Sequence, residues 1–351
     1  LCGRSFCILY TGLMNVVVVY GLPSKRLQST KYGATDEDSA EIADKVILAL
    51  KSLGMEPTVY AISEDAIESI LNIKTECIFN LIEWCGLDIA LSQKAFGCFR
   101  QLHVPVTGSS EELFVLTGDK ARLKRTLQKH GISTPQGEIF ATGEEVIPGD
   151  LIYPMIVKPS LEHCSIGLGY DAIAHNSNEL RQIVKRQIAT FEQSVVAEEF
   201  VVGRELLVYL LEEDDRVRVL PIEEILFKGS NPLVFQTYES KWGVQPGEAE
   251  SEDVAGDAVV AKLSKEEQSV VEQESIKAFK QLGLRGYARF DVRLRGLVPY
   301  LLETNANSSV YDGEGEFSDP DQEVIFGIKF SEYVSKIVQS AIYHHNRGDV
   351  I

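Results

Sequence analysis

The sequence contains little of what marks several common protein classes. Its six cysteines are scattered over 351 residues and none are spaced as Cys-x-x-Cys, which excludes a zinc ribbon and a thioredoxin-like motif. A chain this long buries a core without disulfides, so we interpret the cysteines as reduced, inert thiols. Basic residues are also scarce, with 34 Lys and Arg against 52 Asp and Glu, which gives a net charge of −18. This charge argues against nucleic acid as the main partner but is compatible with nucleotides, which need only a few local lysines and a metal.

Long apolar runs are scarce as well, and the one exception lies near the start of the sequence. Residues 6–22 are nearly all apolar and follow Arg4, which resembles a weak signal peptide without a small-residue cleavage site. Alternatively, residues 16–20 form a buried strand that follows Met14, and the four consecutive valines favour this strand. We therefore interpret residues 1–13 as a leader or upstream extension. Because no other segment is long enough to span a bilayer, we predict a cytoplasmic protein without a membrane partner.

Residues 16–115 alternate between predicted strands and predicted helices. Apolar residues recur on one face of segment 36–53, which predicts a helix that Gly54 ends. Such alternation is typical of βαβ units, so we expect an α/β, doubly wound, Rossmann-like domain over 14–115. The predicted strands are 16–20, 58–62 and 77–82, and the predicted helices are 36–53, a short one from Ser63, and 89–102.

The remainder of the chain has an α+β pattern, which we divide into a central lobe, 116–213, and a C-terminal lobe, 214–351. Two acidic loops interrupt the C-terminal lobe, 247–257 and 312–323. The second loop lacks the glycine of an EF-hand, so we interpret it as a solvated loop. The predicted strands are 136–140, 156–160, 195–201, 205–212, 216–224, 288–294 and 298–305, and the predicted helices are 119–130, 179–191, 264–282 and 328–343.

Two lysines and two glutamates are candidates for a nucleotide site. Lys120 follows a Thr-Gly-Asp turn, and Lys158 lies at the end of an apolar strand, where its ammonium can contact a phosphate. Glu198 and Glu199 end the VVAEEF strand, where carboxylates and edge carbonyls can bind an adenine amino group and ribose hydroxyls. Taken alone, Lys120 is as well explained as a helix-surface lysine.

Three oxygen-bearing residues are candidates for a metal site. Asp291 lies in a hydrophobic strand, and Glu303 and Asn305 are two residues apart, so they share one face of their strand. Carboxylates from two strands and an amide oxygen form the hard oxygen site that Mg²⁺ prefers beside phosphates. In the alternative, Asp291 is an ion-pair partner of Arg289 or Arg293, and Glu303 is an ordinary loop-end carboxylate.

The order of these features resembles the ATP-grasp superfamily and, within it, the D-alanine–D-alanine ligase family. The resemblance runs from about Met14 to Tyr343 and is specific for the superfamily because many motifs occur in the same order. The motifs are MNVVVVYG (14–21), FNLIE (79–83), VPVTGSS (104–110), LTGDKARLKRTLQKHGISTP (116–135), YPMIVKPS (153–160), VVAEEFVVGRELLV (195–208), VFQTYESKW (234–242), GYARFDVRL (286–294) and YLLETN (300–305).

The resemblance implies an ATP-grasp fold, in which two α+β lobes clasp ATP, and a role for each candidate residue. It assigns the ATP phosphates to Lys120 and Lys158, the transferred phosphate to Lys241, and the oxyanion to Arg289 and to the backbone N–H of Ser309. It assigns adenine to Glu198, Glu199, Val201 and the apolar walls Phe200 and Phe235, ribose to Glu205, and Mg²⁺ or Mn²⁺ to Asp291, Glu303 and Asn305.

The implied activity is ATP-dependent ligation of a carboxylate to an amine through an acyl phosphate, with D-alanine as the foremost substrate. The resemblance further implies peptidoglycan biosynthesis, small amino-acid or dipeptide substrates and a homodimer. Two alternatives stay open: a ligase for a different amino acid or dipeptide, and a non-catalytic ATP-binding regulatory protein. Arg289 speaks against the second, because ATP binding alone requires no oxyanion arginine.

The sequence departs from the family pattern at the substrate end. The family joins a Glu, a Ser and a Tyr in one hydrogen-bonded latch, and the matching positions here are Thr35, Cys164 and Trp242. His163 replaces a glycine of the adjoining loop, and a Ser-Leu pair that holds the second substrate has no counterpart. Because altered polar groups leave substrate partners unpaired, we expect the ATP site to follow the family while amino-acid preference differs.

Overall fold

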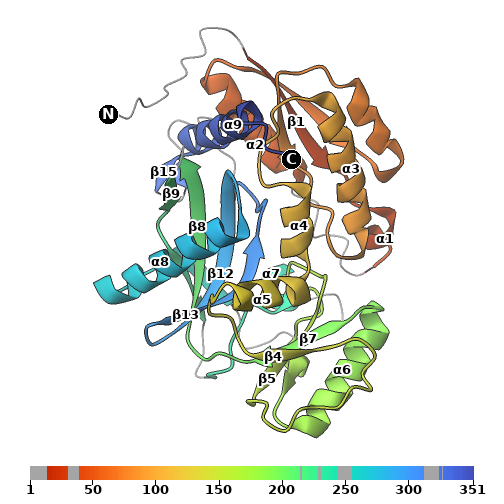
Figure 1. Cartoon of the computed structure of the whole chain (residues 1–351), viewed down its shortest axis with the longest axis vertical. Helices are drawn as coiled ribbons and strands as arrows, with labels where there is room; N and C mark the ends of the chain where they lie inside the picture. The colour runs from red at the N-terminus through yellow and green to blue at the C-terminus, as the bar shows by residue number, and fades with distance from the viewer. Residues whose placement is uncertain are drawn as a thin grey trace.

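The computed structural model describes residues 14–30, 39–213, 216–227, 231–242, 255–311, 324–325 and 327–351. The proposed leader 1–13, Thr35 and the acidic loop 312–323 lie outside the described residues. Figure 1 shows three regions stacked along the longest axis, with the N-terminal part at the top and the β4–β7–α6 region at the bottom.

The N-terminal region is a parallel sheet, as the sequence predicts, and its strand order is β2-β1-β3. Val16 and Val18 of β1 pack toward α2 and α9, whereas Val17 and Val19 pack toward α3. Helices therefore cover both faces, which is why the central strand is apolar throughout. The elements are β1 (Asn15–Gly21), α1 (Lys25–Gln28), α2 (Ser39–Ser52), β2 (Glu56–Ile62), 3₁₀ segments Glu64–Asn72 and Gly86–Asp88, β3 (Cys77–Leu81), α3 (Ile89–Leu102) and α4 (Glu111–Gly118).

The middle of the chain forms an antiparallel sheet of strand order β4-β7-β5-β6, and α6 packs against it. Helix α5 begins at Lys120 because Asp119 caps it, accepting a hydrogen bond from the Arg122 N–H at 3.0 Å. The Lys120 N–H also donates to Ser160 O at 2.9 Å, which ties this helix to the end of β5. The elements are α5 (Lys120–Lys129), β4 (Gly137–Phe140), β5 (Met155–Pro159), a 3₁₀ turn Tyr170–Ala172, β6 (Ile173–Ala174), α6 (Ser177–Phe191) and β7 (Val195–Glu199).

A larger antiparallel sheet of strand order β11-β10-β8-β12-β13 follows, with β9 paired to β8. Helix α8 packs on one of its faces and begins in a capping box formed by Ser264 and Glu267. The elements are β8 (Arg204–Glu213), β9 (Arg216–Val219), β10 (Glu223–Phe227), α7 (Tyr238–Trp242), β11 (Ala255–Val260), α8 (Lys265–Leu282), β12 (Tyr287–Arg295), β13 (Val298–Asn305), β14 (Val324–Ile325), β15 (Ile328–Lys329) and α9 (Phe330–Asn346).

Several expected elements differ from the structure. The single strand expected over 216–224 is two strands, β9 and β10, because Pro221 lies between them and cannot donate to a ladder. Residues 255–257 of the expected acidic loop begin β11. Strand β8 was expected in the central lobe, but it pairs with β10 and β12, so the sheets divide between β7 and β8. The lobe ranges themselves stay a prediction.

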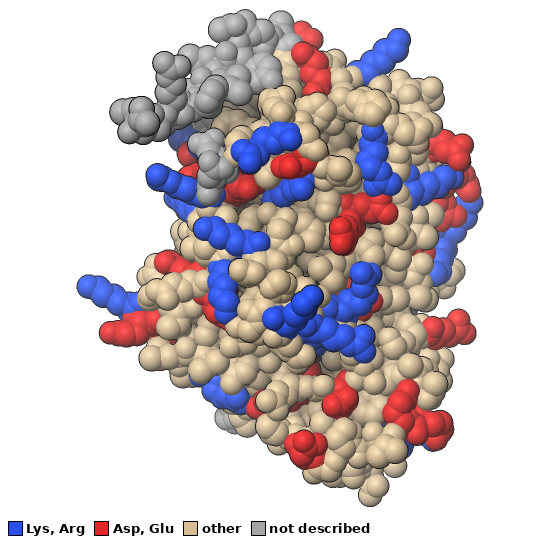
Figure 2. Space-filling view, viewed as in Figure 1, with Lys and Arg blue, Asp and Glu red and all other residues tan. Residues whose placement is uncertain are grey.

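The three regions are joined by buried apolar contacts. One core cluster combines β1 and α2 with Tyr209 of β8 and with Tyr333 of α9, so the N-terminal sheet is packed directly on the large sheet. Figure 2 shows acidic and basic side chains mixed across the face that it draws. Of the cysteines that the structure describes, Cys77 and Cys98 are buried free thiols.

Candidate active site

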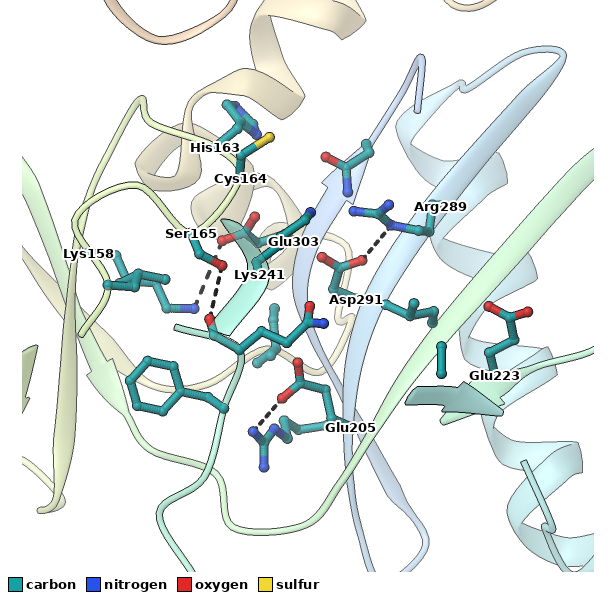
Figure 3. Close-up of a pocket in the computed structure, with 18 of the residues that line it drawn as sticks. Lys158, His163, Cys164, Ser165, Glu205, Glu223, Lys241, Arg289, Asp291 and Glu303 are labelled. Atoms are coloured by element: carbon teal, nitrogen blue, oxygen red, sulfur yellow. Dashed lines mark hydrogen bonds and ion pairs between the residues drawn. The ribbon is translucent and has the colours of Figure 1, made fainter. Parts of the chain in front are cut away.

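A cavity of about 850 Å³ lies between the middle sheet, the large sheet and helix α2. Figure 3 shows residues of β5, β8, β12 and β13 directed toward one another across it. The cavity collects every predicted site residue except Lys120 and Ser309: Lys158, Glu198, Glu199, Phe200, Val201, Glu205, Phe235, Lys241, Arg289, Asp291, Glu303 and Asn305.

The floor of the cavity is one face of the large sheet. Alternate residues of a strand point to opposite faces, so Phe290 and Val292 of β12 pack against α8 while Arg289, Asp291 and Arg293 face the cavity. The register of β8, β12 and β13 places the floor residues in three rows, about 7 Å apart. The first row is Glu205 and Arg293, the second Leu207, Asp291 and Glu303, and the third Tyr209, Arg289 and Asn305.

The aromatic end of the cavity lies beside the first row. Phe200 and Phe235 meet edge to face with centroids 5.9 Å apart, and Tyr170 contacts Phe235 at 5.4 Å. The Arg293 guanidinium lies 5.4 Å from the Phe200 ring centroid and forms a buried ion pair with Glu205. The sequence suggested Arg293 only as a partner of Asp291 and not as a site residue paired with Glu205, although its alternation with Arg289 and Asp291 in an apolar strand was the available signal.

The second row holds the two candidate metal carboxylates. Asp291 and Glu303 are directly opposite on antiparallel strands, a position in which two negative charges repel each other unless cations compensate them. Asp291 accepts a hydrogen bond from Arg289 Nε at 2.9 Å, so the ion-pair alternative is also correct. Asn305 Nδ2 is buried and lacks a hydrogen-bond partner among the described residues, so the amide is free to turn its oxygen toward a cation.

This donor set fits a hard divalent cation whose other ligands are phosphate oxygens. The described part of the chain, this site included, contains no group of three or more His, Cys, Asp or Glu residues able to hold a metal. An all-protein metal cage is therefore not what these residues form. Two carboxylates and an amide leave coordination positions open for phosphate oxygens.

Buried lysines surround Glu303. Its carboxylate lies 3.5 Å from Lys120 Nζ and 4.0 Å from Lys158 Nζ. Burial alone would raise the pKa of Glu303, but the charges of Lys120 and Lys158 outweigh it and lower the pKa to about 2. Lys120 is only 4% exposed, so its interpretation as a surface lysine is wrong.

Glu198 lies under the cavity between two lysines. Its carboxylate is 1% exposed, lies 2.9 Å from Lys158 Nζ and also pairs with Lys124. Burial opposes the ionised form, yet the two ammonium charges lower the pKa of Glu198 overall. Lys124 itself has a lowered pKa because burial outweighs the attraction of Glu198. Sequence analysis missed Lys124, whose signal is its position one turn after Lys120.

The loop after β5 closes one side of the cavity. Ser165 Oγ donates to Gln236 O at 2.9 Å, and the Tyr238 N–H donates to Leu168 O at 2.9 Å, so the loop is tied to the segment that carries Lys241. Cys164 and Ser165 both adopt positive φ, 55° and 60°, which is uncommon for residues other than glycine. The side chain of Trp242 is outside the described residues, so the replaced latch stays untested.

Two predicted residues lie outside the lining of the cavity. Lys120 contacts the cavity through Glu303, as described above, and donates a hydrogen bond to the carbonyl of Glu162. Ser309 follows β13 and donates its hydroxyl to Tyr311 O at 2.9 Å. The proposed oxyanion role of its backbone N–H stays a prediction.

Comparison with known proteins agrees with this geometry. A family model described as D-ala D-ala ligase C-terminus matches residues 125–339. A protein named D-alanine–D-alanine ligase from Cupriavidus pinatubonensis is 31% identical over 248 residues, which are 70% of this chain and 70% of that protein. One of the same name from Thermotoga petrophila is 30% identical over 308 residues, 87% of this chain and 93% of that protein.

A solved structure extends the similarity to the whole fold. The D-alanine–D-alanine ligase of Bacillus anthracis, crystallised with ATP, superposes with a TM-score of 0.71 at 18% identity and covers 96% of this chain and 100% of its own. The chain is thus an ATP-grasp enzyme of the ligase class, as the sequence predicted. It belongs to the D-alanine–D-alanine ligase family. Among the described residues, no helix is long and apolar enough to cross a membrane.

Proposed function

We propose that this protein joins the carboxylate of one amino acid to the amine of another at the expense of ATP, with D-alanine as the first substrate to test. The observation that carries the proposal is the facing pair Asp291 and Glu303 beside Lys158, in a cavity that continues to Arg289. A nucleotide-dependent reaction accounts for the carboxylates, lysines and arginine that are collected around one polar floor.

The residues of each row have a distinct task in this proposal. Phe200 and Phe235 enclose adenine, and Glu205 accepts hydrogen bonds from ribose hydroxyls, aligned by Arg293. Lys158 and Lys120 bind and orient the phosphates as point charges, and Lys241 contacts the transferred group. Asp291, Glu303 and Asn305 would hold Mg²⁺, or Mn²⁺, which supplies neutralisation of phosphate charge when bound.

Arg289 lies one row beyond the metal carboxylates and stabilises the negative oxygen that develops when the amine attacks the acyl phosphate. Its Nε–H donates to Asp291, which fixes the orientation of the guanidinium. The backbone N–H of Ser309 is the second proposed donor. Product is released with ADP and inorganic phosphate.

A different amino-acid substrate is the second candidate function. The observation that favours it is the loop after β5, where His163, Cys164 and Ser165 line the cavity in place of the family pattern of glycine and serines. Burial and the charge of Lys120 lower the pKa of His163 to about 4, so a neutral imidazole faces the cavity at neutral pH. Such a wall presents different hydrogen-bonding groups to the substrate than a serine hydroxyl does.

Steady-state ADP release tests the proposal. The purified full chain is assayed with Mg-ATP and a panel of amino acids that includes D-alanine, D-serine and L-alanine, and products are identified by mass spectrometry. We expect stimulation of ADP release by at least one amino acid together with a dipeptide product. ATP binding without stimulation by any member of the panel would favour the non-catalytic alternative.

We further propose that the protein acts in the cytoplasm as a homodimer, without nucleic-acid or membrane partners, and that its product serves peptidoglycan synthesis. The proposal rests on the family and on the acidic composition of the chain. Sedimentation equilibrium of the purified chain tests the dimer.

A further inference from the structure

A turn of the N-terminal region, residues 107–109, reaches the large sheet where two of its strands carry proposed site residues. The chain before the turn extends the parallel sheet, since Val106 forms a parallel bridge with Ile78 and the Thr107 N–H donates to Ile78 O at 3.0 Å. Thr107 and Ser109 are both fully buried. The turn is therefore a fixed part of the N-terminal region.

Ser109 joins this turn to both strands. Its backbone N–H donates to Asn307 Oδ1 at 2.8 Å, two residues after Asn305 ends β13. Its hydroxyl accepts a hydrogen bond from the Arg285 N–H at 3.1 Å, two residues before β12 begins. Strands β12 and β13 pair with each other, so one buried serine of the N-terminal region holds the start of one strand and the end of its neighbour.

Gly108 allows the turn to approach Asn307 closely. Its φ is 90°, in the left-handed region that favours glycine, and a Cβ at this position would collide with Asn307 Oδ1. Asn307 is 8% exposed, and its Nδ2 lacks a hydrogen-bond partner among the described residues. Asn307 is thus bound to the turn through its side-chain oxygen, which accepts from the buried N–H of Ser109.

This hydrogen bond restrains the loop that follows β13. Ser309, whose backbone N–H is the second proposed donor to the oxyanion, comes two residues after Asn307. Its hydroxyl donates to the carbonyl of Tyr311, a residue that lines the cavity. A donor stabilises a developing negative charge only when it is aimed at that charge in advance, so a loop that shifts would lose part of this stabilisation.

We propose that Asn307 is a positioning residue: held by Ser109 of the N-terminal region, it keeps the backbone N–H of Ser309 aimed at the oxyanion. This inference rests on the proposed function. Because the oxyanion develops only during the reaction, the contact should affect turnover and leave ATP binding unchanged. The N-terminal region thereby contributes to the reaction through a loop of the large sheet.

Turnover and ATP binding, measured separately, test this inference. Asn307→Leu has nearly the same size but lacks the acceptor oxygen, whereas Asn307→Asp keeps it. Calorimetry gives the Kd for Mg-ATP and the number of ATP-binding sites, and dipeptide formation at saturating amino acid is expressed per site, so misfolded protein does not lower it. We expect Asn307→Leu to lower kcat about a hundredfold with an unchanged Kd for ATP, and Asn307→Asp to retain most of the wild-type kcat.

Asn176→Leu is the matched control. Asn176 also accepts hydrogen bonds from backbone N–H groups, but it does so at the start of α6, outside the lining of the cavity. Its replacement removes the same kind of acceptor, so it should lower stability and leave kcat at the wild-type value.

The role of Asn307 and the proposed function fail separately. An Asn307→Leu variant with wild-type kcat would overturn the role of Asn307 and leave the proposed function intact. The same conclusion would follow from equal losses in Asn307→Leu and Asn307→Asp, or from a loss of ATP affinity that accounts for the lower turnover. A wild-type enzyme that forms no product from any amino acid of the panel would overturn the proposed function, and the role of Asn307 with it.

Discussion

The two ends of the cavity are built differently. At the nucleotide end, buried partners compensate three carboxylates: Glu205 is paired with Arg293, Glu198 with Lys124 and Lys158, and Glu303 with Lys120 and Lys158. At the opposite end, beside helix α2, the ammonium of Lys45 is paired with Glu41, whose side chain is 61% exposed. The comparison teaches that the nucleotide end is organised by buried ion pairs before any ligand binds, whereas the opposite end includes an ion pair that reaches solvent.

The largest effect is expected where one cation supports two carboxylates of the nucleotide end. Lys158→Met removes the cation that lies 2.9 Å from Glu198 and 4.0 Å from Glu303. We expect ADP release to fall by about a thousandfold, because phosphoryl transfer depends on charge neutralisation and positioning. The exposed lysine Lys185, paired with Glu144, is the control, and Lys185→Met should keep wild-type turnover. A loss below tenfold for Lys158→Met would contradict the assignment.

A smaller effect is expected for Lys124, which does not line the cavity. Lys124→Met leaves Glu198 with one cation, and breaking a buried ion pair costs about 3–5 kcal/mol of stability. Chemical denaturation measures this loss. In a double-mutant cycle with Glu198→Gln, the second substitution should recover part of it, because no uncompensated carboxylate then remains. Strict additivity of the two losses would show that the pair is not coupled.

The smallest effect concerns acid stability and His163. The pKa of this imidazole is lowered to about 4 in the folded protein, below the ordinary value near 6.5. A depressed pKa contributes stability above pH 6.5 that is lost as pH falls toward 4, since the unfolded chain then binds the proton first. The unfolding free energy of the wild type should decrease between pH 6.5 and pH 4, and we expect His163→Asn to make this decrease smaller by about 2 kcal/mol. Both proteins are measured without nucleotide. Equal slopes in both proteins would refute a buried neutral His163.

Much of the nucleotide end was predictable from the sequence because it is encoded in strands. Period-two alternation in β12 and β13 determines that Asp291, Glu303 and Asn305 share one face, and strand register then brings them together. Lys124 was missed because it looks like a surface charge until helix α5 packs on the sheet, and Arg293 was considered only as a partner of Asp291, whereas it pairs with Glu205. Burial depends on tertiary contacts that no local pattern reports.

The end of the cavity beside helix α2 was less predictable, because burial there also depends on tertiary contacts. Lys45 lies on an amphipathic helix, where a single lysine reads as a solvated residue, and its burial arises only when α2 packs beside Tyr311. Loops contribute the remaining groups, and loop sequences carry little information about their conformation. The positive φ values at Cys164 and Ser165 illustrate this, since no glycine marks either position.

Calorimetric titration with ATP tests the central claim, that the facing carboxylates of the second row bind a divalent cation together with the nucleotide. Wild-type protein and Glu303→Gln are each titrated with and without Mg²⁺, and Glu199→Gln, at the end of β7 in the middle sheet, is the comparison variant. We predict that Mg²⁺ tightens ATP binding to the wild type at least tenfold and that Glu303→Gln abolishes this gain, while Glu199→Gln retains it. An equal gain from Mg²⁺ in the wild type and in Glu303→Gln would contradict the account.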